Sequence, residues 1–306
     1  MRAMVRCNVC SKELASPVEE GVVRSNVRKF RDEQFRVWRC PACHSLHAAD
    51  EVDLAHYYAS YPFHNLGEQS VDWMLQAMYR NQLRRLKAAG LQKHHRVLDY
   101  GCGGGALVQF LRRAGYENVF GFDEYSETYG DKRVLDARYD VIISQDVLEH
   151  VSEPWDFLAT LNTLIEPRGA ILIGTPNADA IDLANPEARV HTLHQPYHRH
   201  IFGKAALLAI GDRMPWTLER YYPTMYSNTG VPFVNSRFVL HYFQQCDDTL
   251  DLAVEPIQAN NPKLFTPATL FWGLFGALFA PETDVMVVYR AQPKQLQAET
   301  RAGASG

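Results

Sequence analysis

Short apolar runs alternate with amphipathic stretches through the middle of this chain. The runs at 96–100, 118–123 and 139–145 each end in polar or glycine residues and predict three buried strands. Apolar residues that recur at helical spacing predict helices over 71–89, 107–114 and 155–165. This alternation of strands and helices is typical of a doubly wound α/β fold.

The alternation of strands and helices continues past residue 165. One connection in the chain is shorter than a minimal α/β fold needs, and another is longer. Pro167-Arg168-Gly169 predicts a turn into a strand that ends at Thr175-Pro176-Asn177, followed by a helix over 204–211 and strands over 217–222 and 284–291. Only sixteen residues separate Asp123 from Asp140, so Val134-Leu135-Asp136 is expected to be a stub of a further strand. About sixty residues before the last strand exceed what a minimal fold needs and predict an inserted cap.

A glycine-rich loop connects the first strand to its helix. Gly101, Gly103 and Gly105 permit positive φ angles and close approach of a ligand, and the helix that follows presents unpaired N–H groups. Asp123 ends the second strand 22 positions beyond Gly101, the spacing at which a carboxylate reaches the ribose of a nucleotide. The loop reads Gly-x-Gly-x-Gly and follows Asp99, which distinguishes it from a nicotinamide site.

These motifs, taken in order over residues 70–223, resemble the class I S-adenosylmethionine-dependent methyltransferases, especially the quinone, sugar and small-molecule branch. The match includes Val97 to Gly105, Gly121-Phe122-Asp123, Leu148-Glu149-His150-Val151 and Pro167 to Asn177. The resemblance implies a Rossmann-like core that binds S-adenosylmethionine. The residues that it implies for the cofactor are Asp99, Gly101, Cys102, Gly103, Gly105, Asp123, Ser144, Gln145, Asp146 and Val147.

Two Cys-x-x-Cys pairs, Cys7/Cys10 and Cys40/Cys43, predict a structural zinc site in the first fifty residues. Four thiolates close a tetrahedral site and leave no position for substrate or water. The alternative is free or disulfide-linked cysteines. His44 and His47 can also act as ligands, but we expect an all-cysteine site with both histidines on the surface.

Histidines supply the candidate catalytic groups, because a neutral imidazole takes a proton from a hydroxyl near pH 7. Four histidines lie within residues 191–200, where metal binding and catalysis are both open readings. The resemblance favours His198 as the base, ahead of His150 in the Glu-His motif. Tyrosines over 57–61 predict either a lid over the substrate or packing between segments.

Composition narrows the functional class. The chain has 306 residues, 46% of them hydrophobic, and a net charge of −4, so nucleic acid is not an expected partner. Residues 1–10 contain no apolar signal segment, which favours the cytoplasm. The mildly basic segment 24–39 leaves open an inactive zinc-containing binding module that contacts nucleic acid.

Residues 270–280 form the most apolar stretch and are too few to span a bilayer, which requires about 20 residues. A buried helix, a homodimer contact and a peripheral membrane contact are the alternatives. The last of these favours a membrane-associated lipid or quinone O-methyltransferase.

The expected function is methyl transfer to a small-molecule acceptor, at a sugar or secondary-metabolite hydroxyl or carbon. The expected organisation is a zinc ribbon over 1–50, an aromatic linker and helix over 51–92, the cofactor-binding core over 93–223, a substrate cap over 224–283, the last core strand over 284–293 and a disordered tail over 294–306.

Overall fold

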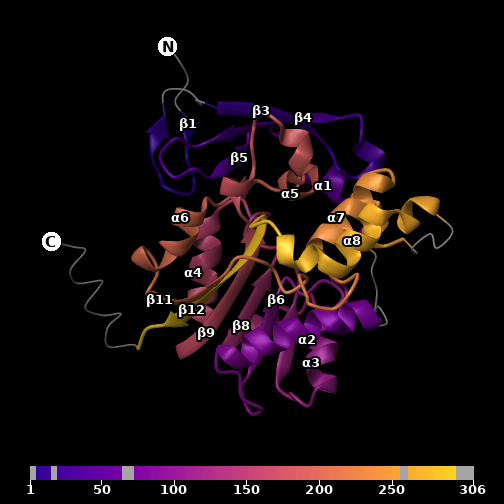
Figure 1. Cartoon of the computed structure of the whole chain (residues 1–306). Coiled ribbons are helices and arrows are strands. Elements are labelled where there is room, and N and C mark those ends of the chain that lie inside the picture. Colours follow the sequence, from indigo (N-terminus) through magenta and orange to yellow (C-terminus); the bar gives the residue numbers. More distant parts are fainter. Residues whose placement is uncertain (1–4, 15–18, 64–71, 256–260, 294–306) are drawn as a thin grey trace.

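A six-stranded sheet forms the centre of the molecule in the computed structural model, which describes residues 5–14, 19–63, 72–255 and 261–293 (Figure 1). The strand order is β11-β12-β9-β8-β6-β7, in which β7, β6, β8 and β9 are parallel and β12 and β11 are antiparallel. The strands are β6 (Val97–Tyr100), β7 (Val119–Phe122), β8 (Tyr139–Gln145), β9 (Ile165–Pro176), β11 (Trp216–Tyr222) and β12 (Asp284–Ala291).

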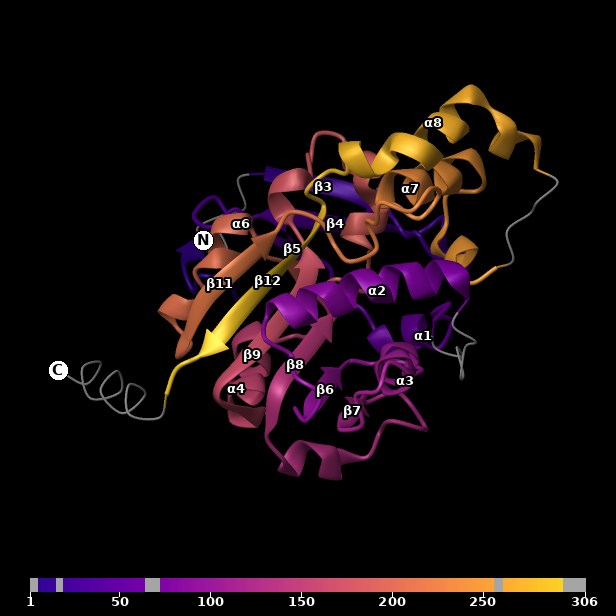
Figure 2. The same cartoon turned by 60° about the horizontal axis from the view of Figure 1, so that its bottom comes forward.

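Helices cover both faces of this sheet, as the doubly wound prediction requires (Figure 2). α2 (Trp73–Ala88) and α3 (Ala106–Arg113) pack with Val97 and Val141, whereas α4 (Pro154–Leu164) packs with Leu98 and Ile142 on the other face. Successive strand residues therefore point to opposite helical layers, which explains why the strands are apolar on both sides. The predicted α/β fold class is confirmed.

Two local predictions are wrong. The turn expected at 167–169 lies inside β9, where residues 166–169 form an irregularity in the pairing with β8 and Arg168 has φ +65°. The strand stub expected at Val134-Leu135-Asp136 is the 3-10 helix η2 (Lys132–Asp136), which begins at the side chain of Asp131. Sixteen residues are too few for a crossover helix and a parallel strand, so the sheet ends at β7.

The N-terminal segment builds a second sheet that includes residues of the core. Its order is β10-β5-β4-β3, and His200 and Ile201 of β10 pair with His47 and Leu46. The elements are β3 (Glu19–Arg24), β4 (Gln34–Arg39), β5 (Leu46–Ala48) and β10 (His200–Ile201), with a separate pair β1 (Val5–Arg6) and β2 (Glu13–Leu14). In Figure 1 this sheet lies above the central one.

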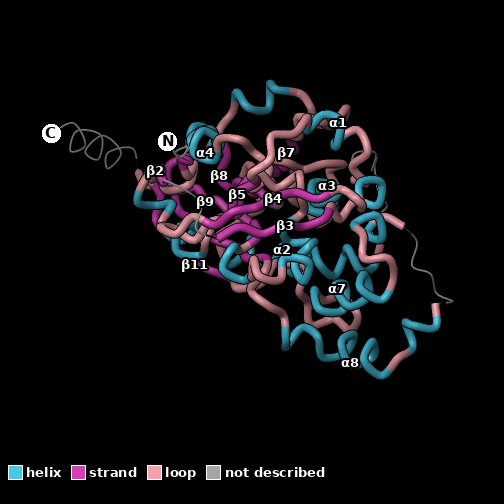
Figure 3. Tube along the Cα trace, turned by 90° about the horizontal axis from the view of Figure 1, so that it is seen from above, coloured by secondary structure: helices cyan, strands magenta, loops and turns pink. Residues whose placement is uncertain are grey.

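The cap contains α7 (Ser236–Gln245) and α8 (Pro267–Phe275), which lie together to one side of the two sheets (Figure 3). Asn235 joins them, since its Oδ1 accepts from Phe238 N and its Nδ2 donates to the carbonyl of Trp272. α8 and the following 3-10 helix η8 (Gly276–Phe279) expose a row of large apolar side chains, so the buried-helix alternative is wrong. That row is Leu270, Phe271, Leu274, Phe275, Leu278 and Phe279.

Short elements complete the fold. They are η1 (Arg28–Phe30), α1 (Leu54–Tyr58), η3 (Ala178–Ala180), η4 (Pro186–Arg189), α5 (Val190–Leu193), α6 (Lys204–Leu208), η5 (Ile210–Asp212), η6 (Leu250–Ala253) and η7 (Pro262–Phe265). In the described part of the chain, no helix is both long and apolar enough to cross a bilayer. The prediction of a disordered tail over 294–306 lies outside the described residues.

Candidate cofactor and acceptor site

The glycine loop between β6 and α3 adopts the left-handed backbone that its sequence predicts. Gly101, Gly103 and Gly105 have φ angles of +81°, +51° and +74°. A Cβ atom on Gly101 would lie 2.2 Å from Cγ2 of Val147, whereas a Cβ atom on Gly103 would have nothing within 4 Å. Gly101 is therefore required for packing, and Gly103 faces open space at the start of a helix, where a ligand can approach the backbone.

Two carboxylates flank this loop. Asp123 accepts from the backbone N–H of Gly103 at 2.9 Å through Oδ2 and from that of Tyr125 at 3.0 Å through Oδ1. Asp99 is buried, and burial together with the charge of Asp123 raises the pKa of Asp99 to about 7. Asp123 thus fixes the loop and keeps further lone pairs free for hydroxyl donors.

The tip of β8 contributes polar atoms whose hydrogen-bonding capacity is unused among the described residues. Ser144 is fully buried and its Oγ has no hydrogen-bond partner. The Oε1 atom of the half-buried Gln145 also has no partner, whereas its Nε2 contacts Sδ of Met225. Asp146 is exposed with φ +54°. Burial raises the pKa of Cys102, so its thiol stays protonated. These orphaned atoms and the open face of Gly103 fit a polar ligand such as S-adenosylmethionine.

Next to β7, the site contains a tyrosine side chain and a 3-10 helix where the sequence predicted the stub of a strand. Tyr129 occupies the space beside the loop, because a Cβ atom on Gly105 would lie 2.2 Å from its ring and one on Gly121 would lie 2.8 Å from it. Asp136, expected at the end of a strand stub, is the last residue of η2 instead. Sequence reasoning missed Tyr129, whose only signal is an aromatic residue in an unusually short connection.

Glu149, His150 and His198 meet at the carboxyl side of β8. Their ligand-type atoms all lie within 4.8 Å of one another, and Nε2 of His198 is 3.8 Å from Oε1 of Glu149. The other oxygen of Glu149 accepts from Oγ1 of Thr175 at 3.0 Å. Nδ1–H of His198 donates to the carbonyl of Thr192 at 3.0 Å, which fixes the ring. The structure therefore brings both candidate catalytic histidines together.

Burial sets the protonation of this group. It lowers the pKa of His150 to about 4 and that of His198 well below its usual value, and the neighbouring histidines lower the latter further. It also raises the pKa of Glu149 well above the usual range. Both imidazoles are consequently neutral at pH 7. Sequence reasoning noted Glu149 only as part of a motif, since burial of its carboxyl depends on the fold.

Tyrosines of residues 58–61, and Tyr197 of the histidine loop (residues 191–200), pack around the cluster. The hydroxyl of Tyr58 is 3.0 Å from Nδ1 of His150, and its ring stacks on Tyr125 with centroids 5.5 Å apart. Tyr61 and Tyr197 contact each other with centroids at 4.8 Å. These contacts pack the linker onto the core, as one of the two alternatives predicts, and a lid over the substrate stays a prediction.

The four cysteines of the N-terminal segment come together. Sγ of Cys7 lies 3.6 Å from that of Cys43, Sγ of Cys10 lies 3.7 Å from that of Cys40, and all four fall within 4.8 Å. A tetrahedral ion with bonds of about 2.3 Å holds sulfur atoms roughly 3.8 Å apart, so the set can hold a metal. The surface position expected for His47 is wrong: it is buried, stacks on Trp38 and lies 3.3 Å from Sγ of Cys7.

Four of the five arginines in the basic segment 24–39 form ion pairs with acids. Arg24 bonds Glu187 and Asp248, while Arg28 bonds Asp247 and Glu255 of the cap. Two more pairs join Arg36 to Asp50 and Arg39 to Glu19. The pairs of Arg24 and Arg28 tie the N-terminal segment to residues 247–255.

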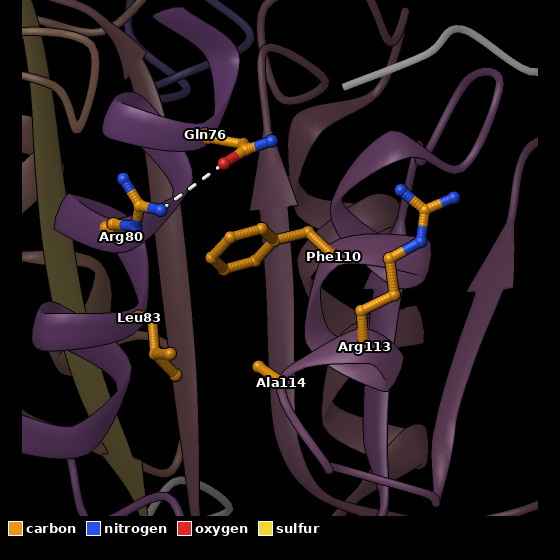
Figure 4. A pocket seen from close by; sticks show the side chains of 6 residues that line it. All are labelled: Gln76, Arg80, Leu83, Phe110, Arg113 and Ala114. Atoms are coloured by element: carbon orange, nitrogen blue, oxygen red, sulfur yellow. Dashed lines mark hydrogen bonds between the residues drawn. The ribbon is translucent and has the colours of Figure 1, made fainter. Parts of the chain in front are cut away.

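One open groove of about 370 Å³ lies elsewhere, between α2 and α3 (Figure 4). Its lining residues are Gln76, Arg80, Leu83, Phe110, Arg113 and Ala114. It lies on the outer helical surface and contains none of the predicted site residues.

Comparison with known proteins identifies relatives of the core. A family model described as "Methyltransferase domain" matches residues 74–251. A ubiquinone biosynthesis O-methyltransferase of Aeromonas salmonicida (strain A449) is 29% identical over 138 residues, which are 38% of this chain and 53% of that protein. One of Cereibacter sphaeroides (strain ATCC 17029) is 28% identical over 137 residues, which are 38% and 55%. The chain thus matches about half the length of these curated relatives.

Solved structures also match at low identity. A putative sarcosine dimethylglycine methyltransferase from Galdieria sulphuraria has a TM-score of 0.43 and 15% identity, over 78% of this chain and 97% of that one. Coclaurine N-methyltransferase bound to N-methylheliamine and SAH has a TM-score of 0.43 and 15% identity, over 72% and 74%.

Proposed function

Because the chain belongs to the methyltransferase family whose domain model matches residues 74–251, we propose that it transfers a methyl group from S-adenosylmethionine to a small-molecule acceptor. The observation that carries this proposal is the open face of Gly103 beside Asp123 and the orphaned polar atoms of β8. The acceptor atom that we favour is a hydroxyl or carbon of a sugar or another secondary metabolite.

The cofactor-binding residues that we propose are those at the three strand tips. Gly101, Cys102, Gly103 and Gly105 border the amino-acid part of the cofactor, and Asp123 accepts from its ribose hydroxyls. Asp99, which is buried on β6 just before the loop, belongs to the same set. Ser144, Gln145, Asp146 and Val147 line the methionine side, which agrees with the unused hydrogen-bonding atoms of Ser144 and Gln145. S-adenosylmethionine supplies an already activated methyl group, so alignment of the acceptor is the main task of the protein.

His198 and His150 are the residues that we propose to act on the acceptor. Both are neutral and adjoin the tip of β8 that lines the cofactor site. For Cys7, Cys10, Cys40 and Cys43 we propose a structural zinc ion, which their sulfur spacing supports. All six cysteines of the chain are free of disulfides, in agreement with the proposed cytoplasmic location.

A second candidate function is O-methylation of a lipid or quinone at a membrane surface. The exposed apolar row on α8 and η8 favours it, and the curated relatives carry the name ubiquinone biosynthesis O-methyltransferase. No charged residue occurs between Leu264 and Pro281, as expected of a peripheral contact with lipid or with a second copy of the chain.

Methyl transfer from labelled S-adenosylmethionine, screened over sugar, phenol and quinol acceptors, tests the proposed activity. Transfer of the labelled methyl group to any of these acceptor classes supports the proposed activity. A protein that binds no S-adenosylmethionine and methylates none of the acceptors contradicts it. Flotation with anionic vesicles separates the two candidates. Wild-type protein that floats, with loss of flotation in Leu274→Ser/Leu278→Ser but not in the exposed control Val22→Ser, supports the membrane candidate. Wild-type protein that stays in the bottom fraction of the gradient contradicts the membrane candidate.

A further inference from the structure

We propose that Glu149, His150 and His198 form a second metal site, which binds one divalent cation of the zinc type beside the acceptor. This inference rests on the proposed function and deepens it, because the cation selects acceptors that offer an ionisable hydroxyl. The site is separate from the cysteine cluster and shares none of its residues.

The spacing of the three side chains supports a shared ion. Their ligand-type atoms fall within 4.8 Å of one another, with 3.8 Å between Nε2 of His198 and Oε1 of Glu149. Bonds of about 2.0–2.2 Å to a common ion require ligand atoms roughly 3–4.4 Å apart. A small rotation of the rings closes the remaining difference.

The carboxylate of Glu149 provides the strongest independent indication. Glu149 is 1% exposed, and its Oε1 points at the two imidazoles without a hydrogen-bond partner among the described residues. A buried oxygen of this kind is costly when nothing compensates it. A cation between Oε1 and the two imidazoles would be a partner for this oxygen and would explain why the three side chains converge.

The surroundings of the two histidines match those of metal ligands. Ligating histidines commonly donate their second ring N–H to a backbone carbonyl, which directs the other nitrogen at the metal. His198 does so through Nδ1–H and the carbonyl of Thr192, and Nδ1 of His150 lies 3.0 Å from the hydroxyl of Tyr58, a contact that likewise leaves Nε2 for a metal. The backbone carbonyl of Glu149 accepts from Arg199 N at 2.8 Å, which ties the tip of β8 to the histidine loop.

The donor set defines the cation and the acceptor. Two imidazoles and one carboxylate suit zinc or a neighbouring first-row ion, and three protein ligands leave a position open. A hydroxyl oxygen at that position becomes more acidic and loses its proton to solvent. The oxygen then forms a bond to the methyl carbon as the sulfur–carbon bond breaks, and the electron pair of that bond stays on the sulfur of S-adenosylhomocysteine. A phenol or enol is therefore the substrate class that this site favours.

Cobalt titration of the full-length protein, after removal of bound metal with a chelator, tests the proposal. Cobalt at the cysteine cluster produces thiolate charge-transfer bands, whereas cobalt at the Glu/His site produces only ligand-field bands. We expect wild-type protein to take up one cobalt ion without charge-transfer bands in addition to the one at the cysteines. Glu149→Gln and His198→Gln should each lose that ion and keep the charge-transfer bands.

His191→Gln is the matched control, because His191 lies in the same loop and pairs with Asp248 outside the cluster. It should keep the second ion. His150→Gln replaces either variant that fails to fold, as judged by circular dichroism. The inference is overturned if wild type and the folded Glu149 and His198 variants take up equal amounts of the cobalt that gives no charge-transfer bands.

Calorimetry with S-adenosylhomocysteine distinguishes this failure from that of the proposed function. Protein that binds S-adenosylhomocysteine but takes up no cation beyond the cysteine cluster overturns only the second metal site. Protein that binds no S-adenosylhomocysteine contradicts the proposed function, whatever its metal content.

Discussion

Alanine at two glycines of the same loop should have opposite effects on stability and on cofactor binding. Gly101 and Gly103 both have positive φ, so alanine costs about 1–2 kcal/mol of backbone strain at either position. At Gly101 the new Cβ also lies 2.2 Å from Cγ2 of Val147, which adds overpacking of about 1–3 kcal/mol. At Gly103 it meets nothing within 4 Å, so strain is the whole cost to folding.

Cofactor binding should follow the reverse order. The methyl group of Gly103→Ala enters the open space that we assign to the amino-acid part of S-adenosylmethionine. If that space is filled in the complex, displacement of the ligand costs about 1–3 kcal/mol, which weakens binding roughly 5- to 150-fold. Gly101→Ala directs its methyl at Val147 and away from that space.

Urea unfolding and calorimetry with S-adenosylhomocysteine measure the two effects separately. We expect Gly101→Ala to lower the free energy of unfolding by about 2–5 kcal/mol and Gly103→Ala by about 1–2 kcal/mol. The double variant Gly101→Ala/Val147→Ala is the control, because it removes the clashing Cγ2. Gly103→Ala protein with wild-type affinity would refute the assignment of the loop, and equal stability of the two single variants would refute the packing argument.

Two further predictions concern buried groups. Burial raises the pKa of Asp99 from 3.8 to about 7, so ionisation of this carboxyl destabilises the folded state increasingly as the pH rises from about 4 to 7. Asp99→Asn should therefore gain up to about 4 kcal/mol relative to wild type in urea unfolding at pH 8 and little at pH 4, and an equal difference at both pH values would contradict this. Cys40→Ser should remove one zinc ion per chain in elemental analysis and increase hydrogen exchange in β3, β4 and β5, whereas Cys246→Ser should change neither; full zinc content in Cys40→Ser would refute the cysteine site.

The sequence predicted those parts of the fold that depend on local patterns. Strands β6, β7 and β8 and helix α3 follow from apolar periodicity, and the glycine loop follows from the need for positive φ. The spacing of the two Cys-x-x-Cys pairs likewise predicted that the four cysteines lie together. Each of these signals lies within a few residues, which is why a single sequence reveals it.

Features that depend on distant contacts were not predictable. His200 joins the N-terminal sheet by pairing with His47, more than 150 positions earlier. The unpartnered oxygen of Glu149 depends on burial by Thr175 and the histidine loop. The missing strand after β7 was misread because a short apolar run resembles a strand, although it lacks a neighbour with which to pair.

The central claim is that the loop at Gly103 borders the amino-acid part of S-adenosylmethionine and that the carboxylate of Asp123 accepts from its ribose hydroxyls. Calorimetric titration of wild type and Asp123→Asn with S-adenosylhomocysteine tests this most directly. Asparagine keeps one oxygen acceptor for the backbone but loses the charge, so we expect one bound ligand per wild-type chain and an affinity lowered by about 1.5–3 kcal/mol, roughly 10- to 150-fold, in the variant. No binding to wild type, or equal affinity in the two proteins, would contradict the account.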